Sequence, residues 1–449
     1  MKSYTAISKI CLYGVRTILT LILIAAATSA SAGATYKVIH AFNGTNGAFP
    51  VGNLVADSAG NFYGVTSEDY GETGDCAGLG CGNVFKLYQT STGGWASTNL
   101  HTFRGGTKDG TSPQAGLVFD SAGNLYGTTW EGGLYGVGTV FELTPTSTGG
   151  WDYSVIYNFG ASYGDGEGPQ SQLVVDSAGN LYGSTISGGL TGGYCNNLSC
   201  GVIYELSPGP DGTWTERVAH SFVGTPDGAW PRGTMVFDAS GNLYGTTTYG
   251  GNLSYCGGGG CGTVFELAPT GTGWVYNVLY SFTGKSDGSY PWYAGVIFDS
   301  AGNLYGTTAG GGRDSQCSGG CGVVYKLSPN GSGGWTETSI HAFAGTDGYF
   351  AAGGGYPVYN LTFDSSGNLY GVTYLGGQDE EGVVYKLTPG GGAWTESVLH
   401  YFSGGSASGY PFQSGLTLGP GGNLYGMTIG DSSTGDCNSN CGAVFQVTP

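Results

Sequence analysis

The stretch GLVFDSAGNLYGTT, residues 116–129, contains the motif that decides the fold of this chain. Its central pentapeptide, Gly-Asn-(Leu/Phe)-Tyr-Gly, occurs seven times, at intervals of 63, 56, 62, 61, 65 and 55 residues. The seven copies begin at Gly60, Gly123, Gly179, Gly241, Gly302, Gly367 and Gly422. Self-similarity at a long, regular period is typical of repeat architectures such as propellers and solenoids.

Each repeat predicts four short strands. In the fifth copy, residues 294–299, 303–308, 322–328 and 335–343 are rich in Val, Ile, Tyr, Phe and Thr, and Gly, Pro, Asn and Ser separate them. Asp299 and Gly302 are the first and fourth residues of the turn after the first strand, which predicts a type I turn followed by a left-handed glycine. The glycine inside the second strand, here Gly306, predicts a close backbone approach where neighbouring blades crowd.

Seven units of four strands predict an all-β protein, a seven-bladed β-propeller with four antiparallel strands per blade. The chain begins, after its first residues, with a segment like a fourth strand (36–42) and stops after a third strand (443–448). We therefore expect the N-terminal strand to complete the last blade and close the ring. The expected single domain is 33–449, with blades at 44–103, 104–159, 160–222, 223–282, 283–343, 344–402, and 403–449 plus 35–42.

Residues 1–32 have the pattern of a signal peptide. Lys2, Lys9 and Arg16 accompany an apolar stretch at 18–27 and small residues at 30–32. An uncleaved membrane anchor is the alternative. Cleavage would leave 10 basic and 31 acidic residues, a net charge of −21. This charge argues against nucleic acid or an anionic membrane surface as a partner, and we expect a monomer.

Ten cysteines fall into five close pairs, which predict disulfides behind a signal peptide. The pairs are Cys76/Cys81, Cys195/Cys200, Cys256/Cys261, Cys317/Cys321 and Cys437/Cys441. Zinc needs four convergent ligands, and each pair offers two with no histidine nearby in sequence. The expected location is secreted, extracellular or at the cell surface, with the periplasm as the alternative.

Residues 116–129, followed by Gly132-Gly133 and by GTVFEL at 138–143, resemble the GloVer tandem repeat of bacterial exported proteins. The resemblance covers nearly all of the chain after residue 32, in seven copies. It implies an exported, propeller-like repeat protein. It implies no established activity and no catalytic residues.

Loops after the second and fourth strands of each blade share one rim, which carries the cysteine pairs and most of the length variation. We place any ligand site there, because variable loops on a rigid scaffold usually carry function. The candidates are tryptophans outside the repeated tryptophan slot and basic residues near them: Trp130, Trp230, Trp292, Arg232, Lys285 and Arg313. Aromatic rings beside a few polar groups suit a sugar ring or an anionic glycan.

Residues that recur at one position of the repeat are interpreted as structural. All five histidines occupy one slot of the fourth strand, so they stand around a circle instead of converging. They are His40, His101, His220, His341 and His400. Six tryptophans open the fourth strands in the same way: Trp95, Trp151, Trp214, Trp274, Trp335 and Trp394. Trp230 also has a structural explanation, because an aromatic residue precedes Pro in five units.

Three functions follow, and whether the protein is an enzyme stays open. The first is a non-catalytic extracellular binding or surface-structural protein, with a glycan or a surface protein as partner. The second is a polysaccharide hydrolase or lyase on the rim. The third is a calcium-dependent adhesion module, although no loop has EF-hand spacing and we expect no other metal or cofactor. Its oxygen ligands would come from the Asp-Gly loops and from Asp69, Asp75, Asp379, Glu380, Glu381, Asp431 and Asp436.

Overall fold

The computed structural model describes residues 33–69, 76, 80–190, 195, 199–312, 317, 319–348, 360–403, 409–430 and 441–449. Apart from two short 3-10 helices, Cys256–Gly258 and Pro420–Gly422, the regular elements in these residues are strands. Within the same residues, no helix is both long enough and apolar enough to span a membrane. The predicted signal peptide, 1–32, lies outside the described residues.

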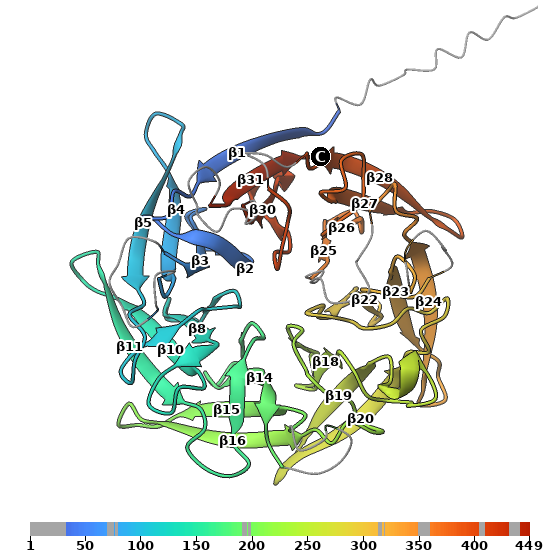
Figure 1. The fold of residues 1–449 in the computed structure, drawn as a ribbon, viewed down its shortest axis with the longest axis horizontal. Coiled ribbons are helices and arrows are strands. Elements are labelled where there is room, and N and C mark those ends of the chain that lie inside the picture. The colour runs from blue at the N-terminus through green and yellow to red at the C-terminus, as the bar shows by residue number, and fades with distance from the viewer. Residues whose placement is uncertain are drawn as a thin grey trace, which may run out of the picture. The chain divides into compact units, whose positions relative to one another are not determined.

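Residues 34–449 form a ring of seven antiparallel sheets, which confirms the predicted seven-bladed propeller (Figure 1). Blade one has β2 Ala48–Ala56, β3 Phe62–Glu68, β4 Asn83–Gln89 and β5 Trp95–Thr102. Blade two has β7 Val118–Phe119, β8 Leu125–Thr129, β10 Thr139–Pro145 and β11 Trp151–Asn158. Blade three has β13 Val174–Val175, β14 Leu181–Gly188, β15 Val202–Pro208 and β16 Trp214–Ser221.

Blade four has β17 Val236–Phe237, β18 Leu243–Thr247, β19 Thr263–Thr270 and β20 Gly273–Ser281. Blade five has β21 Ile297–Phe298, β22 Leu304–Thr308, β23 Val323–Pro329 and β24 Trp335–Ala342. Blade six has β25 Thr362–Phe363, β26 Leu369–Thr373, β27 Val383–Pro389 and β28 Trp394–Tyr401. Short rim strands are β6 Gly110–Thr111, β9 Glu131–Gly132 and β12 Gly166–Pro169.

Blade seven closes the ring as expected. It has β29 Thr417–Leu418, β30 Leu424–Thr428 and β31 Ala443–Thr448. The N-terminal strand β1, Thr35–Ala41, pairs antiparallel with β31 and takes the outer position that the fourth strand holds in the other blades (Figure 1). The two ends of the folded unit are thereby held in one sheet.

The repeated pentapeptide is explained by the turn that precedes it. In blade one, Asp57 accepts the backbone N–H of Ala59 and of Asn61 on one carboxylate oxygen. Its other oxygen accepts the Asn61 side-chain amide at 2.7 Å and the Tyr63 hydroxyl at 3.0 Å. Gly60 has φ +80°, the left-handed conformation that the turn predicts. The first Gly, the Asn and the Tyr of the motif therefore serve the turn.

The glycine in the second strand does face a close approach, but not from a neighbouring blade as predicted. A Cβ at Gly64 would lie 2.7 Å from the ring tip of Phe85, which is its cross-strand partner in the same blade. Gly183 faces Tyr204 in the same way. The tip of the third-strand ring reaches over the second strand, and only glycine leaves room for it.

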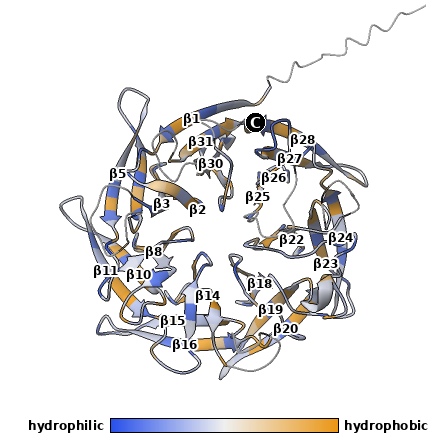
Figure 2. Ribbon diagram, in the orientation of Figure 1, coloured by the Kyte–Doolittle hydropathy of each residue, from blue (hydrophilic) through white to orange (hydrophobic). Residues whose placement is uncertain are grey.

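Apolar residues occur in all seven blades instead of in one central element, as the hydropathy colouring of the ribbon shows (Figure 2). In the described residues they form seven buried clusters, and each cluster joins two neighbouring blades. The repeated tryptophans pack at these seams: Trp151 of blade two meets the motif tyrosine Tyr63 of blade one edge-on at 5.9 Å. Stability therefore resides in the blade-to-blade seams, which is why residues at equivalent positions recur.

Candidate functional site

Disulfides lie on the predicted functional rim, as the cysteine pairs indicated. Four of the five predicted bonds are described with both of their cysteines: Cys76–Cys81, Cys195–Cys200, Cys256–Cys261 and Cys317–Cys321. The fifth predicted pair, Cys437/Cys441, is described only at Cys441, which is buried and disulfide-bonded. Cys437 lies outside the described residues, so its pairing with Cys441 stays a prediction.

The second cysteine of a pair also anchors the next blade through its main chain. The carbonyl oxygen of Cys200 accepts the N–H of Trp230, and that of Cys261 accepts the N–H of Tyr290. Cys441 of blade seven holds blade one in the same way, because its carbonyl oxygen accepts the N–H of Phe49 at 2.9 Å. Each of the three donors precedes a proline. Cys441 therefore has the structural position of its counterparts and helps to close the ring.

Trp230 thus has the structural role that its repeated position suggested. Its φ is +56°, and Phe49, Ser112 and Tyr290 have positive φ at the same position of their blades. A bulky residue in this conformation is strained. The strain recurs at the same place around the ring, where each such residue donates a hydrogen bond to the preceding blade.

Three of the predicted ligand-binding residues do meet on blades four and five. The guanidinium of Arg232 lies 5.4 Å from the ring of Trp230, 5.0 Å from that of Trp292 and 5.1 Å from that of Tyr293. Tyr249 packs edge-on against Trp230 at 5.0 Å. We call these five residues the blade four–five cluster.

The blade four–five cluster is packed rather than open. Tyr293 is buried, and its hydroxyl donates a hydrogen bond at 3.1 Å to Gln170 of blade three. Nε of Arg232 and Nε1 of Trp292 are buried as well. The cluster thus joins three blades near the centre of the rim.

The remaining predicted residues lie elsewhere. Lys285 is exposed, with its ammonium 5.3 Å from the ring of Tyr255. Arg313 lies outside the described residues. Trp130 is 37% exposed and belongs to blade two, where it lines a pocket of about 240 Å³ with Glu131, Glu167 and Ser187.

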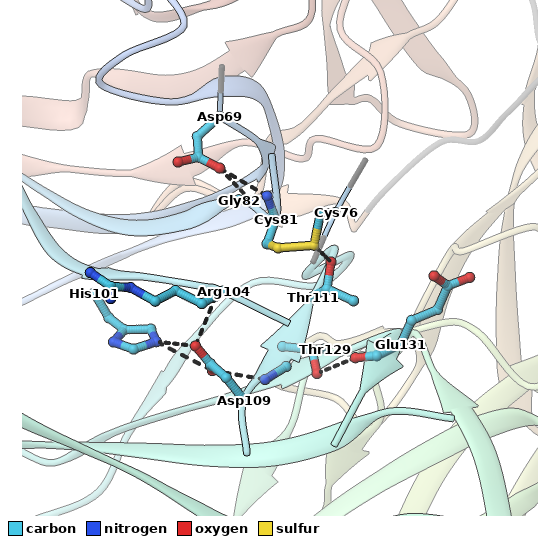
Figure 3. The surroundings of a disulfide bond; sticks show 11 residues. Asp69, Cys76, Cys81, Gly82, His101, Arg104, Asp109, Thr111, Thr129 and Glu131 are labelled. Atoms are coloured by element: carbon cyan, nitrogen blue, oxygen red, sulfur yellow. Dashed lines mark hydrogen bonds and ion pairs between the residues drawn. A yellow bond between two sulfur atoms is a disulfide. The ribbon is translucent and has the colours of Figure 1, made fainter. Parts of the chain in front are cut away.

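A second pocket, of about 320 Å³, adjoins the first, because Glu131 and Gly136 line both. It extends over blade one to Cys76 and Thr111, whose side chains are 3.0 Å apart (Figure 3). Figure 3 also shows Glu131 held at its main-chain oxygen by Thr129 while its side chain extends away from that contact. Together the two pockets offer a ligand a continuous stretch of rim from blade one to blade three.

Exposed apolar side chains gather beside these pockets. Of the eight large apolar residues exposed in the described part of the chain, five belong to loops of blades two and three. We call them the blade two–three surface: Trp130, Leu134, Tyr135, Tyr163 and Leu190. Sequence reasoning missed all but Trp130. The sequence did contain a signal for them. The loop at 130–138, which holds Leu134 and Tyr135, is short and has no cysteine pair, and Tyr163 and Leu190 also stand where the repeat has no fixed residue.

The histidines face the seams on the outer strands, each in a different blade. His101 contacts Asp109 at 3.2 Å and stacks on Tyr153 of the next blade at 3.5 Å (Figure 3 shows the first contact). His220 contacts Asp227 at 3.0 Å and stacks on Tyr276 at 3.9 Å. This arrangement agrees with the structural interpretation of the histidine slot.

Carboxylates of the Asp-Gly loops are occupied by the loops themselves. Asp109 accepts the backbone N–H of Arg104 at 2.9 Å and of Gly110 at 2.7 Å. Asp69 accepts those of Cys81 and Gly82 (Figure 3). Their oxygens order the rim, and calcium binding stays a prediction.

Three glutamates of the outer strands occupy the position at which blades two and four have Tyr153 and Tyr276. They are Glu216, Glu337 and Glu396, opposite a leucine of the third strand in blades three, five and six. Burial raises the pKa of each carboxyl to about 7, and a nearby aspartate adds to the effect. At Glu396, the neighbouring His341 offsets part of this rise in pKa. In the same three blades the buried ring of the third strand is tyrosine, at Tyr204, Tyr325 and Tyr385, where the other blades have phenylalanine.

Comparison with known proteins agrees with the fold. Virginiamycin B lyase from Staphylococcus aureus is 10% identical, with a TM-score of 0.50 over 93% of this chain and 99% of that chain. A protein from Lactobacillus plantarum is 13% identical (TM-score 0.47; 78% and 84% covered). The NanB sialidase from Streptococcus pneumoniae is 12% identical (TM-score 0.43; 92% and 70% covered). At 10% identity the likeness to the lyase concerns the fold alone.

No protein with a curated description matches the sequence. A model of the Gloeobacter/Verrucomicrobia repeat matches it over residues 26–196, 69–257 and 164–356. These overlapping matches cover well over half of the chain, and the seven sheets of the ring carry the repeat that they detect. The chain belongs to the Gloeobacter/Verrucomicrobia repeat family.

Proposed function

We propose that the protein is a secreted, non-catalytic binding protein that holds a glycan on Trp130. The observation that carries the proposal is the indole of Trp130, 37% exposed, over a pocket that also presents Glu131 and Glu167. The face of an aromatic ring suits the apolar C–H face of a sugar, and carboxylates accept hydrogen bonds from its hydroxyls. The four described disulfides indicate an oxidising compartment, where such a ligand is available.

The negative charge of the Trp130 pocket restricts the kind of glycan that it can bind. Two carboxylates line the pocket, and the chain is strongly acidic. Arg232, the cation that would best pair with an anionic sugar, is enclosed by three rings of the blade four–five cluster. An anionic glycan would be repelled at Trp130, so the proposed ligand is neutral or amino-substituted.

Affinity electrophoresis in gels that contain neutral polysaccharides, together with a glycan array, tests this proposal. Trp130→Ala is expected to weaken binding at least about 10-fold, because a stacked ring contributes on the order of 1 kcal/mol or more. Trp292→Ala is the matched control, since it removes a tryptophan of the same rim from the packed cluster and should retain affinity. If the wild-type protein binds no glycan, or if only Trp292→Ala loses binding, the proposal is wrong.

Hydrolysis is the second candidate, because Glu131 and Glu167 share one pocket. A glycosidase uses two carboxyl groups on either side of the scissile bond. Incubation of the protein with the polysaccharide it binds, followed by measurement of new reducing ends, separates the two functions. Release that Glu131→Gln and Glu167→Gln both abolish would favour hydrolysis over simple binding.

A further inference from the structure

The seams between blades share one three-part arrangement. A residue near the end of one outer strand meets the aspartate of the following loop and a residue from the outer strand of the next blade. Two seams combine His, Asp and Tyr: His101 with Asp109 and Tyr153, and His220 with Asp227 and Tyr276. Two others combine Tyr, Asp and Glu: Tyr157 with Asp165 and Glu216, and Tyr280 with Asp287 and Glu337.

The seam between blades five and six combines the imidazole of the first type with the carboxylate of the second. Here β24 supplies His341, the loop after it supplies Asp347, and β28 supplies Glu396. One ligand atom from each of the three side chains lies within 4.8 Å of the other two. In the part of the chain that the structure describes, no other group of three His, Cys, Asp or Glu side chains comes together in this way.

The imidazole at this seam lacks the hydrogen bond that His220 makes at the seam between blades three and four. Nε2 of His220 lies 3.0 Å from its aspartate and is hydrogen-bonded to it. Nε2 of His341 lies 3.4 Å from Oδ2 of Asp347, and that nitrogen is buried without a hydrogen-bond partner. Oε1 of Glu396 is buried without one as well, as are Oε1 of Glu216 and Oε1 of Glu337 in their own seams. Two buried polar atoms of one cluster thus lack the hydrogen bonds that buried groups normally make.

A metal ion would bond to the unpartnered imidazole nitrogen and to the carboxylates that converge beside it. Two ligand atoms at about 2.0–2.1 Å from a tetrahedral zinc ion lie about 3.4 Å apart, which equals the observed separation of His341 and Asp347 within the scatter of such geometry. An imidazole nitrogen with two carboxylates is a ligand set for zinc and similar transition metals, whereas calcium prefers six to eight oxygens.

We propose that His341, Asp347 and Glu396 bind one divalent transition-metal ion of zinc-like chemistry that clamps blade five to blade six. The ion bonds to both outer strands and to the loop between them. A carboxylate pair with a neutral imidazole balances its two positive charges. Three protein ligands leave a fourth position for water. The site is independent of the glycan proposal, since its residues come from blades five and six and the Trp130 pocket from blades two and three.

The test uses the full chain after signal cleavage, made without a polyhistidine tag and dialysed against a chelator. Isothermal titration with Zn²⁺ should give one equivalent per chain, and Zn²⁺ should raise the melting temperature by several degrees. Substituted Co²⁺ should give visible absorption bands of a four- or five-coordinate site. An absence of Zn²⁺ and Co²⁺ binding would overturn the proposal.

Sister seams supply variants that should fold. His341→Tyr converts this seam to the Tyr–Asp–Glu type found between blades two and three, and should weaken Zn²⁺ binding at least about 100-fold. Glu396→Gln should do the same without a change of size. His220→Tyr and Glu216→Gln are the matched controls in other seams and should leave affinity unchanged. Undiminished binding in His341→Tyr would contradict the assigned ligands.

The reverse substitution provides a gain of function. Tyr280→His places an imidazole beside Asp287 and Glu337, which creates the same three ligand types at the seam between blades four and five. The stoichiometry is expected to rise from one equivalent to two. A stoichiometry that stays at one would overturn the inference that these three positions suffice to bind the ion.

Discussion

The blade two–three surface and the blade four–five cluster lie on the same rim and are both rich in aromatic residues, yet they differ in accessibility. Trp130 and Tyr163 are 37% and 76% exposed, whereas Tyr293 is 4% exposed. The rings of the cluster surround the guanidinium of Arg232 and reach across to Gln170. Tryptophans outside the repeated slot therefore have two explanations, a binding surface and a packing anchor, and only their neighbours distinguish them.

The largest expected loss of stability comes from a substitution in the blade four–five cluster. Tyr293→Ala should lower the free energy of unfolding by about 4 kcal/mol, because it removes a buried ring and strands Gln170. Urea unfolding followed by tryptophan fluorescence measures the change. Tyr163→Ala, at an exposed position of the blade two–three surface, is the control, and a comparable loss in that variant would contradict the assignment.

Arg232→Met should cost less, about 2 kcal/mol. Methionine retains the apolar stem but loses the attraction of the guanidinium to three rings, each contact contributing about 0.5–1 kcal/mol. Lys285→Met, which loses one ring contact at an exposed position, should change stability by less than about 0.5 kcal/mol. Equal effects of the two substitutions in the same urea experiment would show that Arg232 is not part of a packed cluster.

The seam glutamates predict a pH dependence that the open surface lacks. The pKa of Glu216 is raised to about 7 in the folded state by burial and by Asp165, above its unfolded value, so the native state binds more protons between these two values. Stability should therefore fall as pH rises from 5 to 8. Glu216→Gln should recover about 1 kcal/mol at pH 8, after allowance for solvent screening. Melting temperatures at the two pH values measure this, and Glu131→Gln in the open pocket should leave the profile unchanged.

Trp130→Ala should have the smallest effect on stability, within about 0.5 kcal/mol, because the indole is largely a surface group. Its effect on glycan affinity should nevertheless be large, as proposed above. A large loss of glycan affinity with a small change in the free energy of unfolding would distinguish the blade two–three surface from the blade four–five cluster. A loss of more than about 2 kcal/mol in Trp130→Ala would place Trp130 with the packing anchors.

Much of the fold could be predicted because it depends on neighbours in sequence. The turn at Asp57 is completed within six residues by Asn61 and Tyr63, so the local sequence predicts it in the six repeats that have this aspartate; the seventh has Gly419. The closure by β1 was also predictable, because an isolated fourth strand and an incomplete last blade complement each other. The cause of the strand-two glycine was predicted wrongly, because the ring that covers Gly64 belongs to a strand whose register no local pattern reveals.

The candidate sites were predicted only in part. The sequence named Trp230, Trp292 and Arg232 as ligand-binding candidates, and the structure brings these three together. The sequence did not reveal that Tyr293 and Tyr249 pack against them, and ligand binding there stays a prediction. Trp130 was placed with them and lies instead in its own pocket with Glu131 and Glu167. An outer-strand glutamate and a third-strand tyrosine occur together in blades three, five and six, at Glu216/Tyr204, Glu337/Tyr325 and Glu396/Tyr385, and the sequence alone shows this correlation.

The seven-bladed ring, its strand order, its turns and the cysteine pairing of the four described disulfides follow from the sequence alone, because these rest on contacts that are local or that recur from copy to copy. The tertiary structure decided which departures from the repeat lie together. His341 and Glu396 are in different copies, and Tyr293 reaches past a whole blade to Gln170. Such contacts depend on how blades face each other in space. The repeated motif is the same in neighbouring blades, so it does not specify which of the non-repeated residues meet.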